Sequence, residues 1–292
     1  MKAAVYSRVF DSSQQEDVQL FFDEIAAQQI EVVLFHDFYQ QIKTTIQLPT
    51  PVKTFCSHQE LTDDIEFIIS LGGDGTLLDT ITLIRDKPVA IMGINFGRLG
   101  FLAGIGRNEV KAAFKAVANR SYVVDSRTLI HVDASIPLFG EIPYALNEFS
   151  IHKRDVAAMI KIHTYLNGEF LNTYWADGLI VATPTGSTGY SLSCNGPVVF
   201  PDSGSFVITP VAPHNLNVRP IVIPDNNIIS FEIESRSDQV ICALDSRREI
   251  VNKDVQLAVK KENFEVNLIR LSENNFLQTL RNKLTWGLDK RN

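Results

Sequence analysis

The sequence predicts two domains, an α/β domain over residues 1–120 and an all-β domain over residues 121–270. Before Arg120, short apolar runs alternate with amphipathic segments, which is typical of parallel strands connected by helices. After Arg120, strand-like runs are separated by turn signals, and helical periodicity is nearly absent until the C-terminus. The length of 292 residues also suits about two domains.

The elements of the first domain follow from the spacing of its apolar residues. Asp17–Ile30 repeats them at helical intervals, whereas Phe67–Leu71 is almost wholly apolar, as a strand buried on both faces should be. The expected strands are Ala3–Tyr6, Glu31–Phe35, Phe67–Leu71 and Val89–Ile94. The expected helices are Asp17–Ile30, Asp37–Ile46, Leu77–Arg85 and Glu109–Ala118. This alternation predicts a parallel sheet covered on both faces.

The second domain consists of strand-like runs bounded by turns such as Asn167-Gly168. The expected strands are Leu129–Ala134, Met159–Leu166, Leu179–Thr183, Ile228–Glu234 and Val255–Lys260. They favour a sandwich or a related fold of stacked sheets. Residues 271–292 form a C-terminal segment with a helix over Asn275–Trp286, which we expect to pack back on the first domain.

Composition excludes several classes of function. A net charge of −7 disfavours a nucleic-acid partner, because domains that bind nucleic acid usually carry a basic patch. No apolar run approaches the ~18 residues of a transmembrane helix, and the N-terminus does not resemble a signal peptide. We therefore expect no membrane partner and a cytoplasmic location. Cys56, Cys194 and Cys242 lie far apart, which favours buried reduced thiols over a disulfide framework or a zinc site.

The first chemical motif is Gly72-Gly73-Asp74-Gly75-Thr76, which directly follows the strand Phe67–Leu71. Its glycines allow a tight turn and a close approach to a ligand, and the helix expected to begin near Thr76 directs N–H groups at the loop. Phosphate is the ligand that such a loop favours. A carboxylate beside phosphates needs a reason, either binding a metal or accepting a proton from an attacking hydroxyl. The alternative is a simple turn in which Asp74 or Thr76 caps the helix.

A second glycine-bearing turn, Gly93–Leu102, follows the next strand of the sheet. Loops after neighbouring parallel strands meet at the carboxyl edge, where open α/β sheets bind ligands. Phe101 either offers an apolar surface to a base there or is an ordinary core aromatic. The chain has neither a GxxxxGK[ST] nor a clean GxGxxG sequence, so a Walker-type site and a hydride-transfer site are both unsupported.

The densest polar segment is Asp177–Ser193, in which an apolar strand leads into hydroxyl residues punctuated by glycine and proline. Hydroxyls that donate and accept suit ribose, amide and phosphate groups. Asp177 can accept hydrogen bonds from a ribose diol, and Tyr190 can stack on a base. Asn147-Glu148 adds an amide and a carboxylate that can bind an adenine edge or a sugar hydroxyl. The alternative is a surface turn rich in serine and threonine.

Together these motifs resemble the NAD kinase family. The similar stretches are GGDGT at 72–76, GINFGRLGFL at 93–102, NE at 147–148, DGLIVATPTGSTGYSLS at 177–193 and PVAPHNLNVRPIV at 210–222. The resemblance implies a Rossmann-like N-terminal domain, a β-rich C-terminal domain and a site between them. It implies phosphorylation of the adenosine 2′-hydroxyl of NAD by ATP or polyphosphate, with a divalent cation such as Mg²⁺. It also implies a homo-oligomer, a tetramer or dimer.

The resemblance also assigns roles to residues. Asp74 is the proton acceptor, and the phosphate loop is Gly72, Gly73, Gly75 and Thr76. The residues expected at NAD are Asp74, Gly75, Phe101, Asn147, Glu148, Asp177, Thr188, Gly189, Tyr190, Ser191, Leu192, Ser193, Ala212 and Arg247. No protein residue is expected to be a metal ligand. Gly189 stands where many members have alanine, and Trp175 and Ala158 stand where relatives carry polar residues.

Two other functions fit part of the pattern. A lipid or sugar kinase would share only the GGDGT stretch and would leave Asp177–Ser193 unexplained. A non-catalytic regulator that binds NAD(P) would have no need of Asp74 as a base.

Overall fold

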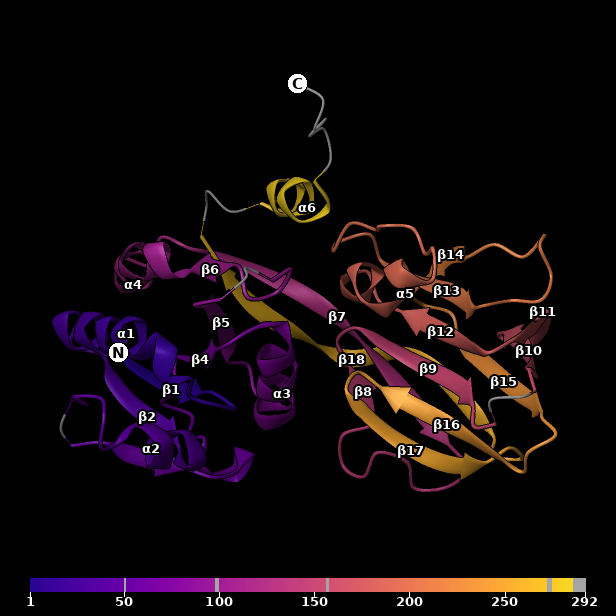
Figure 1. The fold of residues 1–292 in the computed structure, drawn as a ribbon, viewed down its shortest axis with the longest axis horizontal. Coiled ribbons are helices and arrows are strands. Elements are labelled where there is room, and N and C mark those ends of the chain that lie inside the picture. Colours follow the sequence, from indigo (N-terminus) through magenta and orange to yellow (C-terminus); the bar gives the residue numbers. More distant parts are fainter. Residues whose placement is uncertain (50, 98–99, 156–157, 272–274, 286–292) are drawn as a thin grey trace. The chain divides into compact units, whose positions relative to one another are not determined.

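The computed structural model describes residues 1–292 except for 50, 98–99, 156–157, 272–274 and 286–292 (Figure 1). The chain divides into two compact units. The first contains Met1–Ser126 together with Val266–Asn292, and the second contains Arg127–Glu265. Strands β7 (Val123–Ala134) and β18 (Leu257–Arg270) each carry the chain from one unit into the other.

The first unit is built on a parallel sheet, as the sequence predicts. Its strands are, in sheet order, β3 (Lys53–Phe55), β2 (Glu31–Phe35), β1 (Lys2–Tyr6), β4 (Phe67–Leu71) and β5 (Ala90–Asn95). Every neighbouring pair in this order is parallel, and β6 (Ile105–Gly106) pairs beside β5. Strands β3 and β6 are too short to leave a periodic pattern in the sequence.

Helices pack on both faces of this sheet. They are α1 (Gln15–Ala27), α2 (His36–Ile42), α3 (Asp74–Ile84) and α4 (Val110–Ala118), and a further helix, α6 (Phe276–Leu284), follows β18 (Figure 1). Phe21 of α1 lies against Phe114 of α4, with ring centroids 5.5 Å apart, in a core that includes Met92 of β5. The next residue, Gly93, faces the opposite side, where an added Cβ would lie 2.9 Å from Leu77 of α3. Helix α3 therefore packs closely on that face.

Most helices differ from the sequence expectation at their ends. Helix α1 spans Gln15–Ala27 rather than Asp17–Ile30, and α2 ends at Ile42 rather than Ile46. Helix α3 begins at Asp74 rather than near Thr76, so the aspartate belongs to its first turn. The C-terminal helix α6 is described to Leu284, and Trp286 lies outside the described residues.

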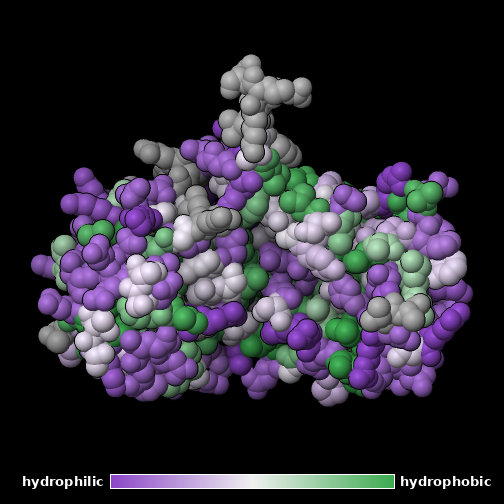
Figure 2. Space-filling model, viewed as in Figure 1, coloured by the Kyte–Doolittle hydropathy of each residue, from purple (hydrophilic) through white to green (hydrophobic). Residues whose placement is uncertain are grey.

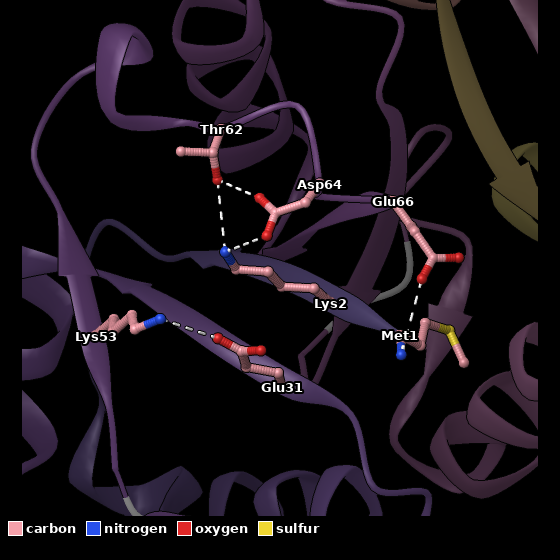
Figure 3. A network of polar contacts seen from close by, with 7 residues as sticks. All are labelled: Met1, Lys2, Glu31, Lys53, Thr62, Asp64 and Glu66. Carbon is pink, nitrogen blue, oxygen red and sulfur yellow. Dashed lines mark hydrogen bonds and ion pairs between the residues drawn. The ribbon is translucent and has the colours of Figure 1, made fainter.

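The amino ends of the parallel strands are joined by charged pairs (Figure 3). Lys2 Nζ lies 2.8 Å from Asp64 Oδ2, and Lys53 Nζ lies 3.4 Å from Glu31 Oε1. Lys2, Glu31 and Lys53 are the first residues of β1, β2 and β3. These pairs occupy the amino edge, whereas open α/β sheets bind ligands at the carboxyl edge.

The second unit contains two sheets. One runs in the order β14 (Ile221–Pro224), β13 (Ser205–Val211), β12 (Gly178–Ala182), β9 (Glu148–Lys153), β16 (Gln239–Leu244) and β17 (Arg247–Asn252), with all neighbours antiparallel. The other runs β11 (Glu169–Ala176), β10 (Ile160–Leu166), β15 (Ile229–Glu234) and β18. Strand β7 pairs with β18 and with β8 (Tyr144–Ala145).

The two sheets share one core. Phe149 of β9 and Phe231 of β15 belong to different sheets, yet their ring centroids lie 6.2 Å apart in a single apolar cluster. The predicted turn at Asn167-Gly168 is confirmed, with φ angles of 50° and 85° between β10 and β11. The β-rich character of this half is therefore confirmed, although β7 and β18 are longer than expected.

The structure corrects one expectation about the thiols. Cys56, Cys194 and Cys242 are all free, but only Cys242 is buried and Cys56 is exposed. Cys56 is exposed because it directly follows β3, which lies at the edge of its sheet.

Hydrophilic residues predominate on the face seen in Figure 2. Among the described residues, no helix combines the length and the apolar character needed to cross a membrane.

Candidate active site

The glycine loop lies at the carboxyl end of β4 and leads directly into α3. Gly72 has a φ of 152°, and an added Cβ would lie only 2.4 Å from Thr76 Oγ1. The Gly72 N–H donates to the Ile94 carbonyl at 2.8 Å, which ties the loop to the neighbouring strand β5. Position 72 therefore requires glycine, both for its backbone conformation and for its close approach to α3.

Asp74 does not cap its helix but holds a neighbouring loop. Its Oδ2 accepts a hydrogen bond from Phe101 N at 2.9 Å, and its Oδ1 accepts from Leu102 N and Ala103 N at 3.0 Å. A Cβ on Gly100 would lie 1.7 Å from Asp74 Oδ1, so only glycine fits there. The two predicted glycine turns thus meet around one carboxylate. The Phe101 side chain is partly buried, and Arg98 and Leu99 of the second turn lie outside the described residues.

A cavity of about 290 Å³ lies beside the glycine loop, within the first unit. Gly72, Gly73 and Thr76 line one part, and Ser7 and Arg8, which follow β1, line another. Sheet order places β1 between β2 and β4, so the chain's direction of winding reverses between β1 and β4. Open α/β sheets bind ligands at such a reversal, which makes this cavity the candidate phosphate site.

In the second unit, Asn147 and Glu148 are held by the carboxylate of Asp245, which no sequence motif indicates. Asp245 Oδ1 accepts from Asn147 N at 2.8 Å and Glu148 N at 3.2 Å, and Oδ2 accepts from Leu146 N at 3.0 Å. Burial raises the pKa of Asp245, and these three donors oppose the rise. Asp245 lies between β16 and β17, where an aspartate in the sequence indicates only a turn.

The carboxyl group of Glu148 is also strongly perturbed. Burial, followed by the nearby charge of Asp245, raises its pKa to about 8, although the Tyr190 N–H donates to it. Its Oε2 is buried and accepts no hydrogen bond within the described structure. A buried polar atom without a partner is costly, so Glu148 is a strong candidate for a ligand contact.

The hydroxyl-rich segment is helical rather than extended. It forms a 3-10 turn, Thr185–Thr188, and a short helix α5 (Tyr190–Ser193), because its hydroxyls bond to nearby backbone. Ser187 Oγ donates to Pro184 O at 2.6 Å, and Thr188 Oγ1 donates to Thr185 O at 3.1 Å. Ser191 is buried and bonded to Thr209. Several predicted ligand hydroxyls therefore have internal partners.

Other expected contacts lie in α5 and at Asp177, between β11 and β12. Ser193 is exposed and Leu192 partly buried, while Tyr190 is 40% exposed with its ring 5.7 Å from that of His152. Burial lowers the pKa of His152. Asp177 Oδ1 lies 2.6 Å from Lys153 Nζ. His152 and Lys153 carry no signal in the sequence beyond their place in a strand.

The remaining expected residues are more scattered. Ala212 is exposed with a φ of 44°. The two terminal nitrogens of Arg247 donate to the carbonyls of Ile142 and Tyr144. Trp175 is 41% exposed and stacks on His214 at 4.3 Å between centroids. Trp175 and Ala158 both line a separate cavity of about 610 Å³ in this unit.

Comparison with known proteins identifies the family. Residues 10–122 match the model of the ATP-NAD kinase N-terminal domain, and residues 146–271 match that of the ATP-NAD kinase C-terminal domain. The NAD kinase of Cytophaga hutchinsonii is 46% identical over 290 residues, covering 99% of both chains. That of Flavobacterium psychrophilum is 42% identical over 294 residues, covering 100% of both.

The chain belongs to the NAD kinase family. As a member it is a phosphotransferase that acts on NAD. Two solved structures share its fold. Yeast NADH kinase complexed with NADH has a TM-score of 0.88 at 21% identity, covering 99% of this chain and 88% of that chain. An Archaeoglobus fulgidus NAD kinase in complex with ATP has a TM-score of 0.75 at 26% identity, covering 98% and 99%.

The glycines of the NAD kinase motif differ in the substitutions that they tolerate. A Cβ on Gly186 would lie 2.1 Å from Asn147 O, a backbone atom, whereas one on Gly189 would lie 3.1 Å from the Glu148 side chain. Gly186→Ala is expected to lower the free energy of unfolding by about 1–3 kcal/mol or more. Gly189→Ala should cost less, because the nearest atom to its Cβ is the end of a side chain, which can shift more easily than backbone. Urea unfolding of both variants checks this; equal losses would contradict it.

Glu148 should make the stability of this kinase depend on pH. Its folded pKa of about 8 lies above its ordinary value of 4.5, so its contribution is full below the ordinary value. That contribution is lost as pH rises through the folded value. The Tm of Glu148→Gln, relative to wild type, should therefore increase between about pH 5 and pH 8.5. Thermal unfolding across this range tests it.

Glu234→Gln is the matched control for this experiment. The pKa of exposed Glu234 is lowered by Lys161, so the variant should gain no stability as pH rises. Parallel Tm profiles for wild type and Glu148→Gln would show that Glu148 titrates as an ordinary carboxyl group.

Proposed function

We propose that this NAD kinase transfers the terminal phosphoryl group of ATP to the 2′-hydroxyl of the adenosine ribose of NAD, giving NADP and ADP. The observation that carries the proposal is Asp74, a carboxylate within the glycine loop and at the start of α3. In the reaction, the 2′-oxygen forms a bond to phosphorus, the bond from phosphorus to the ADP oxygen breaks, and the 2′-hydroxyl proton passes to Asp74. We also propose that the first unit has a Rossmann-like architecture and the second a sandwich-like one.

Positioning should contribute more to catalysis than basicity. Aspartate is a weak base for a sugar hydroxyl, and the Asp74 carboxylate already accepts three backbone N–H groups. These three hydrogen bonds fix the position and orientation of the carboxylate. Proton transfer is therefore late, and the alignment of donor and acceptor supplies most of the rate.

The second unit supplies groups for the acceptor nucleotide. Glu148, with a raised pKa and a buried oxygen that accepts no hydrogen bond in the described structure, suits a ribose hydroxyl, which can both donate and accept. Asn147 suits an adenine edge, and the exposed ring of Tyr190 suits stacking on a base. Asp245 positions Asn147 and Glu148 by accepting hydrogen bonds from their backbone N–H groups. The roles of Asp177, Ala212 and Arg247 remain predictions.

The divalent cation is best regarded as part of the donor. Among the described residues, no group of three or more histidine, cysteine, aspartate or glutamate side chains is arranged to hold a metal. Mg²⁺ commonly binds through substrate phosphates, water and one or two carboxylates. We therefore propose Mg²⁺–ATP as the substrate, and homo-oligomerisation and a cytoplasmic location as further features.

One assay tests the function. Purified protein is incubated with NAD, ATP and Mg²⁺, and NADP is detected with a dehydrogenase that accepts only NADP. We expect NADP to accumulate only when all three are present. Binding of NAD without NADP formation would instead favour a regulator. Phosphorylation of a lipid or sugar without NADP would favour a kinase of another substrate class.

A further inference from the structure

The cavity beside the glycine loop is lined by an arginine, Arg8, to which the proposed reaction assigns no role. Of the described residues that line it, Arg8 alone carries a charge. Gly72, Gly73 and Thr76 of the glycine loop also line it. An otherwise neutral cavity with a single guanidinium suits an anion, and the planar arginine fork matches phosphate oxygens.

Arg8 is fixed to the same helix that follows the glycine loop. Its Nε donates to Asp79 Oδ2 of α3 at 2.7 Å, and one of its terminal nitrogens also pairs with that oxygen. Tyr6 O–H donates to the same oxygen at 3.3 Å. Burial, with the Asp79 charge as the next cause, raises the pKa of Tyr6 to about 12, so Tyr6 remains a donor at neutral pH. Asp79 and Tyr6 thus orient Arg8 in the frame of α3.

This arrangement is unlike a pair that serves stability alone. The Arg8 side chain is 55% exposed, and exposed ion pairs contribute little to folding. No hydrogen bond from the second terminal nitrogen of Arg8 is found within the described part of the chain. The guanidinium therefore has donors available for a ligand while its orientation is held.

The volume of the cavity indicates which part of the two substrates, ATP and NAD, can fit in it. At about 290 Å³ it lies at the lower end of ligand pockets, which span roughly 300–1,000 Å³. It suits a chain of phosphates better than a whole dinucleotide. Because Gly72, Gly73 and Thr76 belong to the predicted phosphate loop, the ligand should be the phosphoryl donor.

We propose that Arg8 binds the phosphoanhydride chain of the donor in this cavity, with Asp79 and Tyr6 as its positioning residues. The inference rests on the proposed function, which names a phosphoryl transfer but assigns no side chain to the donor. Phosphoanhydride chains occur in both ATP and inorganic polyphosphate, and Arg8 recognises the chemistry that they share.

The test measures equilibrium binding of ATP and, separately, of inorganic tripolyphosphate to the full chain, both with Mg²⁺, by calorimetry. Arg8→Gln should weaken binding of both ligands by about 10- to 100-fold, the loss expected for charge-assisted hydrogen bonds. Arg8→Lys, which keeps the charge but not the fork, should be intermediate. Asp79→Asn should raise the KM for ATP and leave the KM for NAD unchanged, a split that general loss of structure would not produce.

Lys53→Gln is the matched control, since it removes an exposed cation from an ion pair at the opposite edge of the sheet. It should bind both ligands as wild type does. Unchanged binding by Arg8→Gln would overturn the inference, and so would a loss confined to ATP, because Arg8 would then recognise the nucleoside. Donor binding that depends on Arg8 without NADP formation would leave the inference standing and overturn the proposed function.

Discussion

Asp74→Asn is expected to lower kcat for NADP formation by about two to four decades, the range for a lost general base. Asparagine cannot accept the 2′-hydroxyl proton. Its amide also offers a single acceptor oxygen, whereas the carboxylate now accepts N–H groups from Phe101, Leu102 and Ala103 on both oxygens. Steady-state kinetics with NAD and ATP, alongside thermal unfolding, measures the two effects together.

The control for this variant is Asp64→Asn, which removes a carboxylate that pairs with Lys2 at the amino edge of the same sheet (Figure 3). Its kcat should match wild type. If Asp74→Asn retained the wild-type kcat, the assignment of the base would fail. A changed Mg²⁺ requirement at a modestly reduced kcat would show instead that Asp74 acts through the cation.

Gly100→Ala is expected to reduce kcat by at least about 100-fold while the fold is retained. The new Cβ would lie 1.7 Å from Asp74 Oδ1 and 2.4 Å from its Cγ, so the carboxylate or the loop must move. Displacement of about 1 Å at a catalytic group commonly costs two decades in rate. The accompanying loss of unfolding free energy should be about 1–3 kcal/mol, as for other overpacked sites. Kinetics and urea unfolding of the same preparation separate the two.

Gly104→Ala provides the matched comparison in the same loop. There the nearest atom to an added Cβ is Leu102 O at 4.0 Å, which is an ordinary contact. We expect near wild-type kcat. Equal activity of the two alanine variants would mean that the Asp74 carboxylate need not occupy its observed position.

Local sequence was sufficient where structure depends on local physics. Phe67–Leu71 is strand β4 with the predicted bounds, because a buried parallel strand is recognisable from its own apolar run. The turn at Asn167-Gly168 was equally predictable, since tolerance of positive φ belongs to the residues themselves. The glycine loop and the candidate base were found in the same way. Helix ends and the hydroxyl-rich segment were less predictable, because side-chain to backbone bonds decide them.

The sequence by itself determined the alternation of the main strands and helices in the first domain, the β-rich character of the second, the position of the glycine loop and the presence of Asp74 in it. Only the tertiary structure decided what that carboxylate touches, because its N–H donors lie 27 to 29 residues further along the chain. The same holds for Asp245, whose donors are 97 to 99 residues away, and for Arg8, which meets Asp79 across 71 residues. Contacts at such separations depend on sheet order and packing, which local patterns do not contain.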